Sequence, residues 1–230
     1  MSVIWLALIT AFIPVVAVHI SLVLAISAEA IPACVPYLEG CASISATGRN
    51  APASYVFKPV LTVQSGLLCL YWSLNARWLN LMSTGEETQG RSFPVIVLLG
   101  YGAATSLIIY VTFLGTNEPF YQLMRRFGIY GYFLGTVLAQ IWLALATQRV
   151  GKAHGVALCQ NIGRLQLVCA LFPFLLGILN LLLKAVLPEA QADRYENIIE
   201  WVAAAMMQVG IGLTYWSWRA TRFRLYAAAG

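Results

Sequence analysis

The sequence has few charged residues. Asp, Glu, Lys and Arg make up 10% of the 230 residues, and hydrophobic residues make up 60%, whereas soluble domains carry about 25% charged residues. This composition excludes an ordinary soluble protein and indicates a membrane protein. The net charge of +5 does not indicate a nucleic-acid partner, because the basic residues lie at the ends of apolar runs and form no single patch.

Residues that support common catalytic or metal chemistry are also scarce. The chain has two histidines, His19 and His154, and no CxxC motif or Cys/His cluster, so we expect neither a bound metal nor another cofactor. No GxSxG motif marks a hydrolase serine. An inverted repeat and pairs of Gly/Pro-broken helices are missing too, which weighs against a small-solute transporter, although that function stays open as a second alternative.

Long apolar runs are what the sequence does contain. Each is roughly 20 residues long and could cross about 30 Å of hydrocarbon. The first lacks a basic n-region and exceeds a signal-peptide core, so we expect it to be retained. The sequence therefore predicts an all-α polytopic membrane protein, one domain over residues 1–230, with six transmembrane helices in one bundle: Val3–Ile26, Phe57–Leu81, Phe93–Leu114, Phe127–Thr147, Leu165–Leu187 and Ile198–Trp218.

Basic residues at the span ends predict the orientation. The side that holds both termini carries eight of them, against six on the other side, which also holds most of the acids. The positive-inside rule then places both termini in the cytoplasm and the first connection outside. The eight are Arg77, Arg91, Arg149, Lys152, Arg164, Arg219, Arg222 and Arg224.

The first connection is long and contains the polar stretch YLEGCASISATGRNAPASYVF, residues 37–57. Loops of this length are usually functional or disordered. Because polar residues alternate with Ile44, Tyr55 and Phe57, we expect an ordered outer loop packed on the bundle. Cys34 and Cys41 lie in it with six residues between them, and they either form a disulfide or remain two free thiols.

Polar residues recur at helical spacing inside three spans. Such a stripe either forms hydrogen bonds between helices, worth on the order of 1 kcal/mol each, or lines a polar cavity within the bundle, and the spacing leaves both readings open. The stripes are Gln64, Tyr71 and Asn75; Gln166, Cys169, Pro173, Gly177, Asn180 and Lys184; and Glu200, Gln208 and Tyr215.

Residues with useful chemistry gather at the predicted outer face. Glu200 lies in the first turn of the last span, where it either pairs with Arg126 or Lys184 or takes part in head-group binding or acid/base chemistry. Glu200 and His19 are the candidate catalytic residues, and His19 has a packing role as its alternative. The candidate lipid-binding residues are Ser43, Ser45, Thr47, Gly48, Pro52, Tyr55, Phe57, Lys58, Glu118, Arg126, Lys184 and Glu200.

The run Ile44–Ser45–Ala46–Thr47–Gly48, followed by Pro52 and an aromatic residue at the start of a helix, resembles the FRAG/DRAM/SFK family. That family includes damage-regulated autophagy modulators and a Golgi protein of GPI-anchor lipid remodelling. Its pattern is roughly Ile-Ser-Asp-Thr-Gly, then Pro-Pro-Glu. Looser matches are the lead-in Val35–Leu38, the segment Asn117–Phe120, and Glu200–Trp201 with Tyr215–Trp216 in the last span.

The resemblance implies a multi-pass protein that handles lipids. Ala46 and Ala53 replace the family's two acids, and the last span lacks a mid-helix histidine, so specific GPI remodelling is not implied. We expect a protein that binds or organises lipids at the outer leaflet without catalysis. An acyl-chain remodelling enzyme is the alternative, and a protein partner stays open. Abundant Ala, and Arg in excess of Lys, suggest a bacterial inner membrane.

Overall fold

The computed structural model describes residues 3–83 and 93–224, and the regular structure in these ranges is entirely helical. This confirms the predicted all-α class. Two short helices, α2 (Pro36–Glu39) and α3 (Ile44–Thr47), lie between the first two long ones. The long helices are α1 (Trp5–Ser27), α4 (Ser54–Met82), α5 (Phe93–Thr112), α6 (Pro119–Ala153), α7 (Ala157–Val186) and α8 (Glu189–Ala220).

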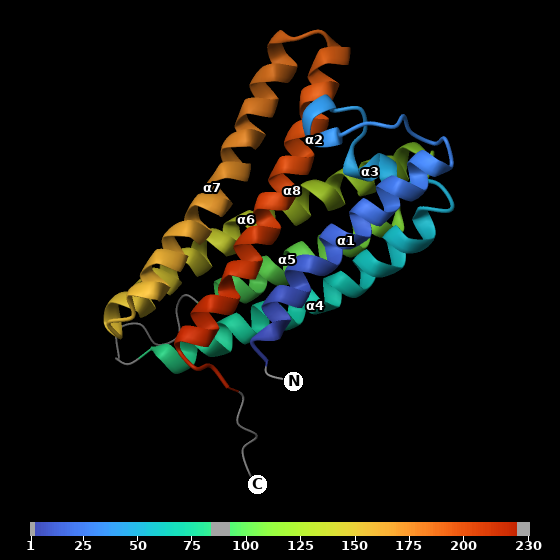
Figure 1. Ribbon diagram of the computed structural model, residues 1–230. Helices are drawn as coiled ribbons and strands as arrows, with labels where there is room; N and C mark the ends of the chain where they lie inside the picture. The colour runs from blue at the N-terminus through green and yellow to red at the C-terminus, as the bar shows by residue number, and fades with distance from the viewer. Residues whose placement is uncertain (1–2, 84–92, 225–230) are drawn as a thin grey trace.

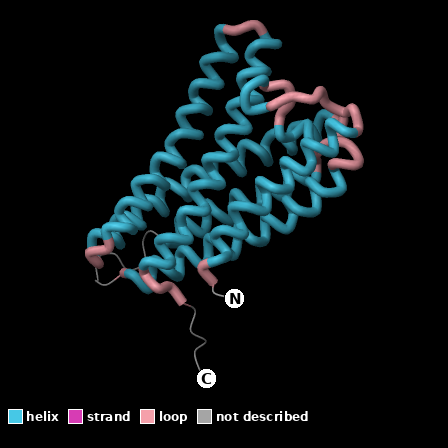
Figure 2. Tube along the Cα trace, viewed as in Figure 1, coloured by secondary structure: helices cyan, strands magenta, loops and turns pink. Residues whose placement is uncertain are grey.

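The long helices alternate in direction, so α1 begins and α8 ends at the same end of the bundle (Figure 1). We call this the terminal end, and the opposite end, which carries α2 and α3, the loop end (Figure 2). Short connections favour such antiparallel neighbours. Consecutive long helices pack together, and α1 also packs on α8. At the loop end α7 and α8 rise together away from α6 (Figure 1).

Five helices within the described residues are long and apolar enough to cross a membrane: α1, α5, α6, α7 and α8. The chain is therefore an integral multi-pass membrane protein. Six such helices were predicted, and α4 is not among the five. Its buried face carries Gln64, Ser65 and Asn75, and these polar residues lower its mean hydropathy.

Three helices begin eight or nine residues earlier than the apolar runs predicted, and one of them is α7, which starts at Ala157 and not at Leu165. Helix α6 starts at Pro119 and not at Phe127, because proline suits the first helical position, where its missing N–H is not needed. Helix α8 starts at Glu189 and not at Ile198, with an acid in its first turn that favours the positive end of the helix. Polar sequence thus continues α6 and α8 beyond the apolar segment.

Most of the polar stripes join helices. The Gln64 Nε2 donates to the carbonyl of Thr10 at 2.8 Å, and the Tyr71 hydroxyl lies 2.7 Å from that of Thr214. The Gln166 Nε2 donates to the same Thr214 hydroxyl at 2.9 Å. These contacts tie α1, α4, α7 and α8 together.

Arg91, one of the eight basic residues counted for orientation, lies outside the described residues.

Candidate functional site

One side of α8 holds the connection between α1 and α4 in place. The Arg194 Nε donates to the carbonyl of Glu39 at 2.7 Å, the Asn197 Nδ2 to the carbonyl of Gly40 at 2.8 Å, and the Trp201 Nε1 to the carbonyl of Ala42 at 2.9 Å. Positions 194, 197 and 201 share one face of a helix. Side chains of α8 thus satisfy three backbone carbonyls at and just after the end of α2, which have no backbone partner in the part of the chain that the structure describes.

A disulfide and a glycine in the left-handed region also fix the segment around α2. The structure joins Cys34 to Cys41 in a disulfide, with their Cα atoms 6.6 Å apart. Gly40 ends α2 in the left-handed region, with φ of 61°, which glycine adopts at no steric cost. A Cβ at this position would also run into the backbone of Arg194. The loop backbone therefore lies directly against α8.

The Glu200 side chain lies at the first turn of α3. The backbone N–H groups of Ile44 and Ser45 face its carboxylate, and the Ser43 hydroxyl accepts from the N–H of Ala46 at 3.1 Å. The first N–H groups of a helix have no partner within it, and negative charge is favourable there. Glu200 therefore faces the end of α3 that the Ser43 hydroxyl caps. Its predicted pairing with Arg126 or Lys184 is not the arrangement that the structure shows.

Residues of the Ile-Ser-Ala-Thr-Gly motif pack inward. Thr47 is fully buried, and its hydroxyl donates to the carbonyl of Ile44 at 2.7 Å. The Ser45 hydroxyl lies 2.9 Å from that of Tyr110 on α5. Gly48 rests on the ring of the buried Phe57, so closely that a Cβ would overlap the ring. Three of the predicted lipid-binding residues are thus buried in the loop interior, where the loop packs on the first turn of α4: Thr47, Gly48 and Phe57.

The Gly48→Ala variant is expected to lower the free energy of unfolding by about 1–3 kcal/mol, the usual cost of overpacking. The buried Phe57 ring would have to shift to admit the new methyl group. Thermal unfolding of the protein in mild detergent measures the change. Gly66→Ala is the matched control, because a Cβ on Gly66 of α4 has no atom within 4 Å. Equal stability of the two variants would contradict this packing.

Both ring nitrogens of His19 are engaged. Its Nδ1 lies 2.7 Å from the carbonyl of Val15, which can only accept, so Nδ1 carries a proton. Its Nε2 lies 3.3 Å from the Tyr37 hydroxyl. Burial raises the pKa of Tyr37, which keeps that hydroxyl protonated as a donor. His19 also packs edge-on against Trp201, with ring centroids 5.5 Å apart.

His19 and Glu200 line different spaces. His19, Tyr37 and Trp201 border a small apolar cavity of about 70 Å³ inside the bundle, whereas Glu200 borders a larger groove on the other side of α8. Among the described residues, no hydrogen bond joins the two side chains. The acid/base pair suggested by the sequence therefore stays a prediction without a contact to support it.

The larger space, which we call the groove, lies between α6, α7 and α8 at the loop end and has a volume of about 510 Å³. Most of its wall is apolar, and its polar side chains gather toward one end. It is lined by Ser45, Ile129, Tyr130, Phe133, Leu134, Val137, Pro173, Phe174, Gly177, Ile178, Asn180, Leu181, Lys184, Glu196, Ile199, Glu200 and Ala203. A groove of this size is within the range of small-molecule sites.

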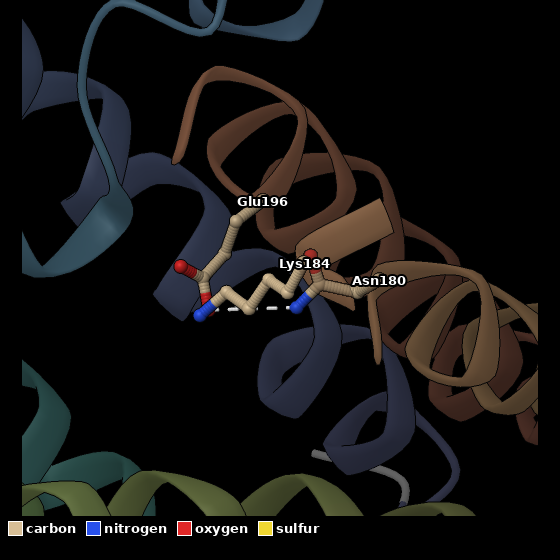
Figure 3. Close-up of polar contacts among 3 residues, drawn as sticks. All are labelled: Asn180, Lys184 and Glu196. Atoms are coloured by element: carbon tan, nitrogen blue, oxygen red, sulfur yellow. Dashed lines mark hydrogen bonds and ion pairs between the residues drawn. The ribbon is translucent and has the colours of Figure 1, made fainter. Parts of the chain in front are cut away.

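The polar end of the groove is built by α7 and α8. The Lys184 Nζ donates to Glu196 Oε1 at 2.8 Å, and the Asn180 Nδ2 lies 3.4 Å from the same oxygen. Figure 3 shows Asn180 and Lys184 of α7 directed toward Glu196 of α8. The Lys184 and Glu196 side chains are 40% and 31% exposed, so the pair remains accessible.

The structure brings only part of the predicted site together. Ser45, Lys184 and Glu200 line the groove. The other predicted residues outside the loop interior border neither the groove nor the small cavity: Ser43, Pro52, Tyr55, Lys58, Glu118 and Arg126. Sequence reasoning placed Asn180 only in a polar stripe and left Glu196 out of the site. The spacing of Asn180 and Lys184, one helical turn apart, was the available signal.

The Glu200→Gln variant is expected to lower the free energy of unfolding by about 1 kcal/mol, because glutamine offers one acceptor oxygen where glutamate offers two. The amide oxygen can then accept from the α3 N–H groups, but the amide nitrogen cannot. Detergent thermal unfolding measures the loss. Glu196→Gln is the control, because Glu196 contacts Lys184 and not α3, and partly exposed ion pairs contribute little. An equal loss in both variants would refute the role given to Glu200.

The fold and this site define a class: a multi-pass helical membrane protein whose loop between the first two long helices is fastened to its last helix. Comparison with protein families gives the next step. Residues 2–221 match the Frag1/DRAM/Sfk1/Cwh43P N-terminal domain, so the chain belongs to that family. This confirms the resemblance carried by the loop motif. No curated protein and no solved structure matches the chain significantly.

Proposed function

We propose that this protein binds a membrane lipid in the groove between α6, α7 and α8, with the acyl chain along the apolar wall and the head group at the polar end. The observation that supports this most is the composition of the groove. Phe133, Val137 and Phe174 line its apolar part, and Asn180 and Lys184 lie at its polar end. An apolar space with a polar end matches the two parts of a lipid.

The proposal includes α4 as a sixth span. Its 29 residues correspond to about 43 Å of helix, longer than the hydrocarbon core. Three of its polar residues, Gln64, Ser65 and Asn75, face other helices and not lipid, since they are buried. With six spans and the charge bias of the sequence, both termini lie in the cytoplasm. The loop end and the polar end of the groove then meet the outer leaflet.

Binding without catalysis is the form of the proposal that the contacts support. The Glu200 carboxylate faces the N–H groups of α3, and both nitrogens of His19 have partners. A general base needs access to the proton that it removes, directly or through one water. His19 has no free ring nitrogen for that role, and no hydrogen bond among the described residues joins it to Glu200. The lipid is therefore held, and its bonds are left intact.

Lipid recovery tests the proposal. The full chain is purified in mild detergent, and the lipids that remain bound are identified and counted by native mass spectrometry. We expect at least one lipid species retained through a wash that strips a control six-helix membrane protein of its lipids. Recovery equal to that control would overturn the proposal.

A further inference from the structure

Hydrogen-bond acceptors are in excess at the polar end of the groove. Two carboxyl groups, those of Glu196 and Glu200, and one ammonium, that of Lys184, line it. Lys184 is already paired with Glu196 at 2.8 Å. The Asn180 Oδ1 is buried and has no hydrogen-bond partner among the described residues. Buried acceptors of this kind are costly unless a donor reaches them.

From this arrangement we infer that the groove selects a lipid whose head group carries a protonated primary amine next to a phosphate, as in phosphatidylethanolamine. The inference rests on the proposed function and adds the head-group chemistry. The ammonium donates to the carboxylates of Glu196 and Glu200 and to the Asn180 Oδ1. The phosphate accepts from Lys184. Each of the two head-group charges then meets an opposite charge of the protein.

Other common head groups fit less well. A phosphate with an uncharged alcohol, as in phosphatidylglycerol, draws Lys184 away from Glu196 and supplies no cation to replace it. A quaternary ammonium, as in phosphatidylcholine, has no N–H to donate and is usually held between aromatic faces. The groove has three aromatic lining residues, Tyr130, Phe133 and Phe174. Phe133 and Phe174 line its apolar part, so only Tyr130 is left to contact a quaternary ammonium at the polar end. The acceptors therefore favour a donor with three N–H bonds.

The Lys184–Glu196 pair can exchange partners at little cost. Both side chains are partly exposed, and exposed ion pairs contribute about 0–1 kcal/mol. When a lipid enters, Lys184 can turn to the phosphate while Glu196 turns to the ammonium. The ion pair seen between α7 and α8 thus keeps the two groups in place for a zwitterionic head group.

Native mass spectrometry tests the head-group preference. The full chain is stripped of lipid and exposed to phosphatidylethanolamine, phosphatidylcholine and phosphatidylglycerol with the same acyl chains. We expect phosphatidylethanolamine to bind about tenfold better than either, the factor for 1.4 kcal/mol. Equal binding of all three, or preference for either of the others, overturns the head-group inference and leaves the proposed function standing. Binding of none overturns the proposed function itself.

Two variants connect the preference to these residues. Asn180→Leu removes the free acceptor and Glu196→Gln removes a carboxylate, and each is expected to reduce the preference for phosphatidylethanolamine over phosphatidylcholine while total lipid binding persists. Glu189→Gln is the control, since Glu189 lies on the same helix, is exposed and does not line the groove. An unchanged preference in both groove variants would refute the assignment.

Discussion

Replacing Trp201 with alanine is expected to destabilise the protein by about 3–5 kcal/mol, the usual cost of removing a buried tryptophan. Trp201 is 1% exposed and packs against Tyr37 with ring centroids 5.2 Å apart. Its indole N–H also holds the carbonyl of Ala42. Thermal unfolding and size-exclusion chromatography in detergent would show a lower melting temperature and a smaller folded fraction.

Two companion variants separate packing from hydrogen bonding. Trp201→Phe retains most of the ring volume but leaves the carbonyl of Ala42 without its donor, which costs about 1–3 kcal/mol. Trp216→Ala removes a tryptophan that is 42% exposed on the same helix, and we expect a smaller loss. If Trp216→Ala were as damaging as Trp201→Ala, the effect would come from tryptophan loss in general. The attachment of the loop to α8 would then contribute little to the stability of the protein.

Filling the groove is expected to remove most of the bound lipid. Gly177 lies in the groove wall, and a Cβ built there has no atom within 4 Å. Gly177→Phe therefore adds a ring at the wall of the space proposed for the acyl chain, and its Cβ meets no protein atom. The lipid-to-protein ratio after purification, measured by mass spectrometry, should fall well below that of the wild type while the melting temperature of the delipidated protein stays close to its original value.

The matched control is Gly102→Phe. Gly102 is also an exposed glycine within a long helix, α5, and a Cβ there meets nothing within 4 Å. It lines neither the groove nor the small cavity, so its lipid content should match the wild type. Equal lipid content in the two variants would show that the lipid binds elsewhere on the protein.

The helices and the importance of the loop could be predicted from the sequence because both depend on local patterns. Apolar runs mark helices that cross a bilayer, and the loop motif marks the family. The contacts of Glu200 could not be read this way. Its position near a helix start suggested a charged partner, but the groups that face it are N–H groups of α3, more than 150 residues earlier in the chain. Only the folded arrangement brings α3 to α8.

The composition of the site was harder to predict for a geometric reason. Counting residues along a span estimates depth in the membrane, so Glu118, Arg126 and Glu200 were expected at one level. Depth does not tell which side of the bundle a residue faces, and Glu118 and Arg126 turn out to be exposed away from both cavities. The stripe on α7 shows the same limit: Gln166 bonds to α8, while Asn180, on the same face, lines the groove.

Helix α8 presents different faces to the loop and to the groove. At roughly 100° per residue, positions 194, 197 and 201 face the loop, positions 196, 199 and 203 face the groove, and Glu200 lies between the two sets and touches both. The loop and the groove therefore depend on the orientation of the same helix. A small rotation of α8 about its own axis would lengthen its hydrogen bonds to the loop and change the shape of the groove in the same movement.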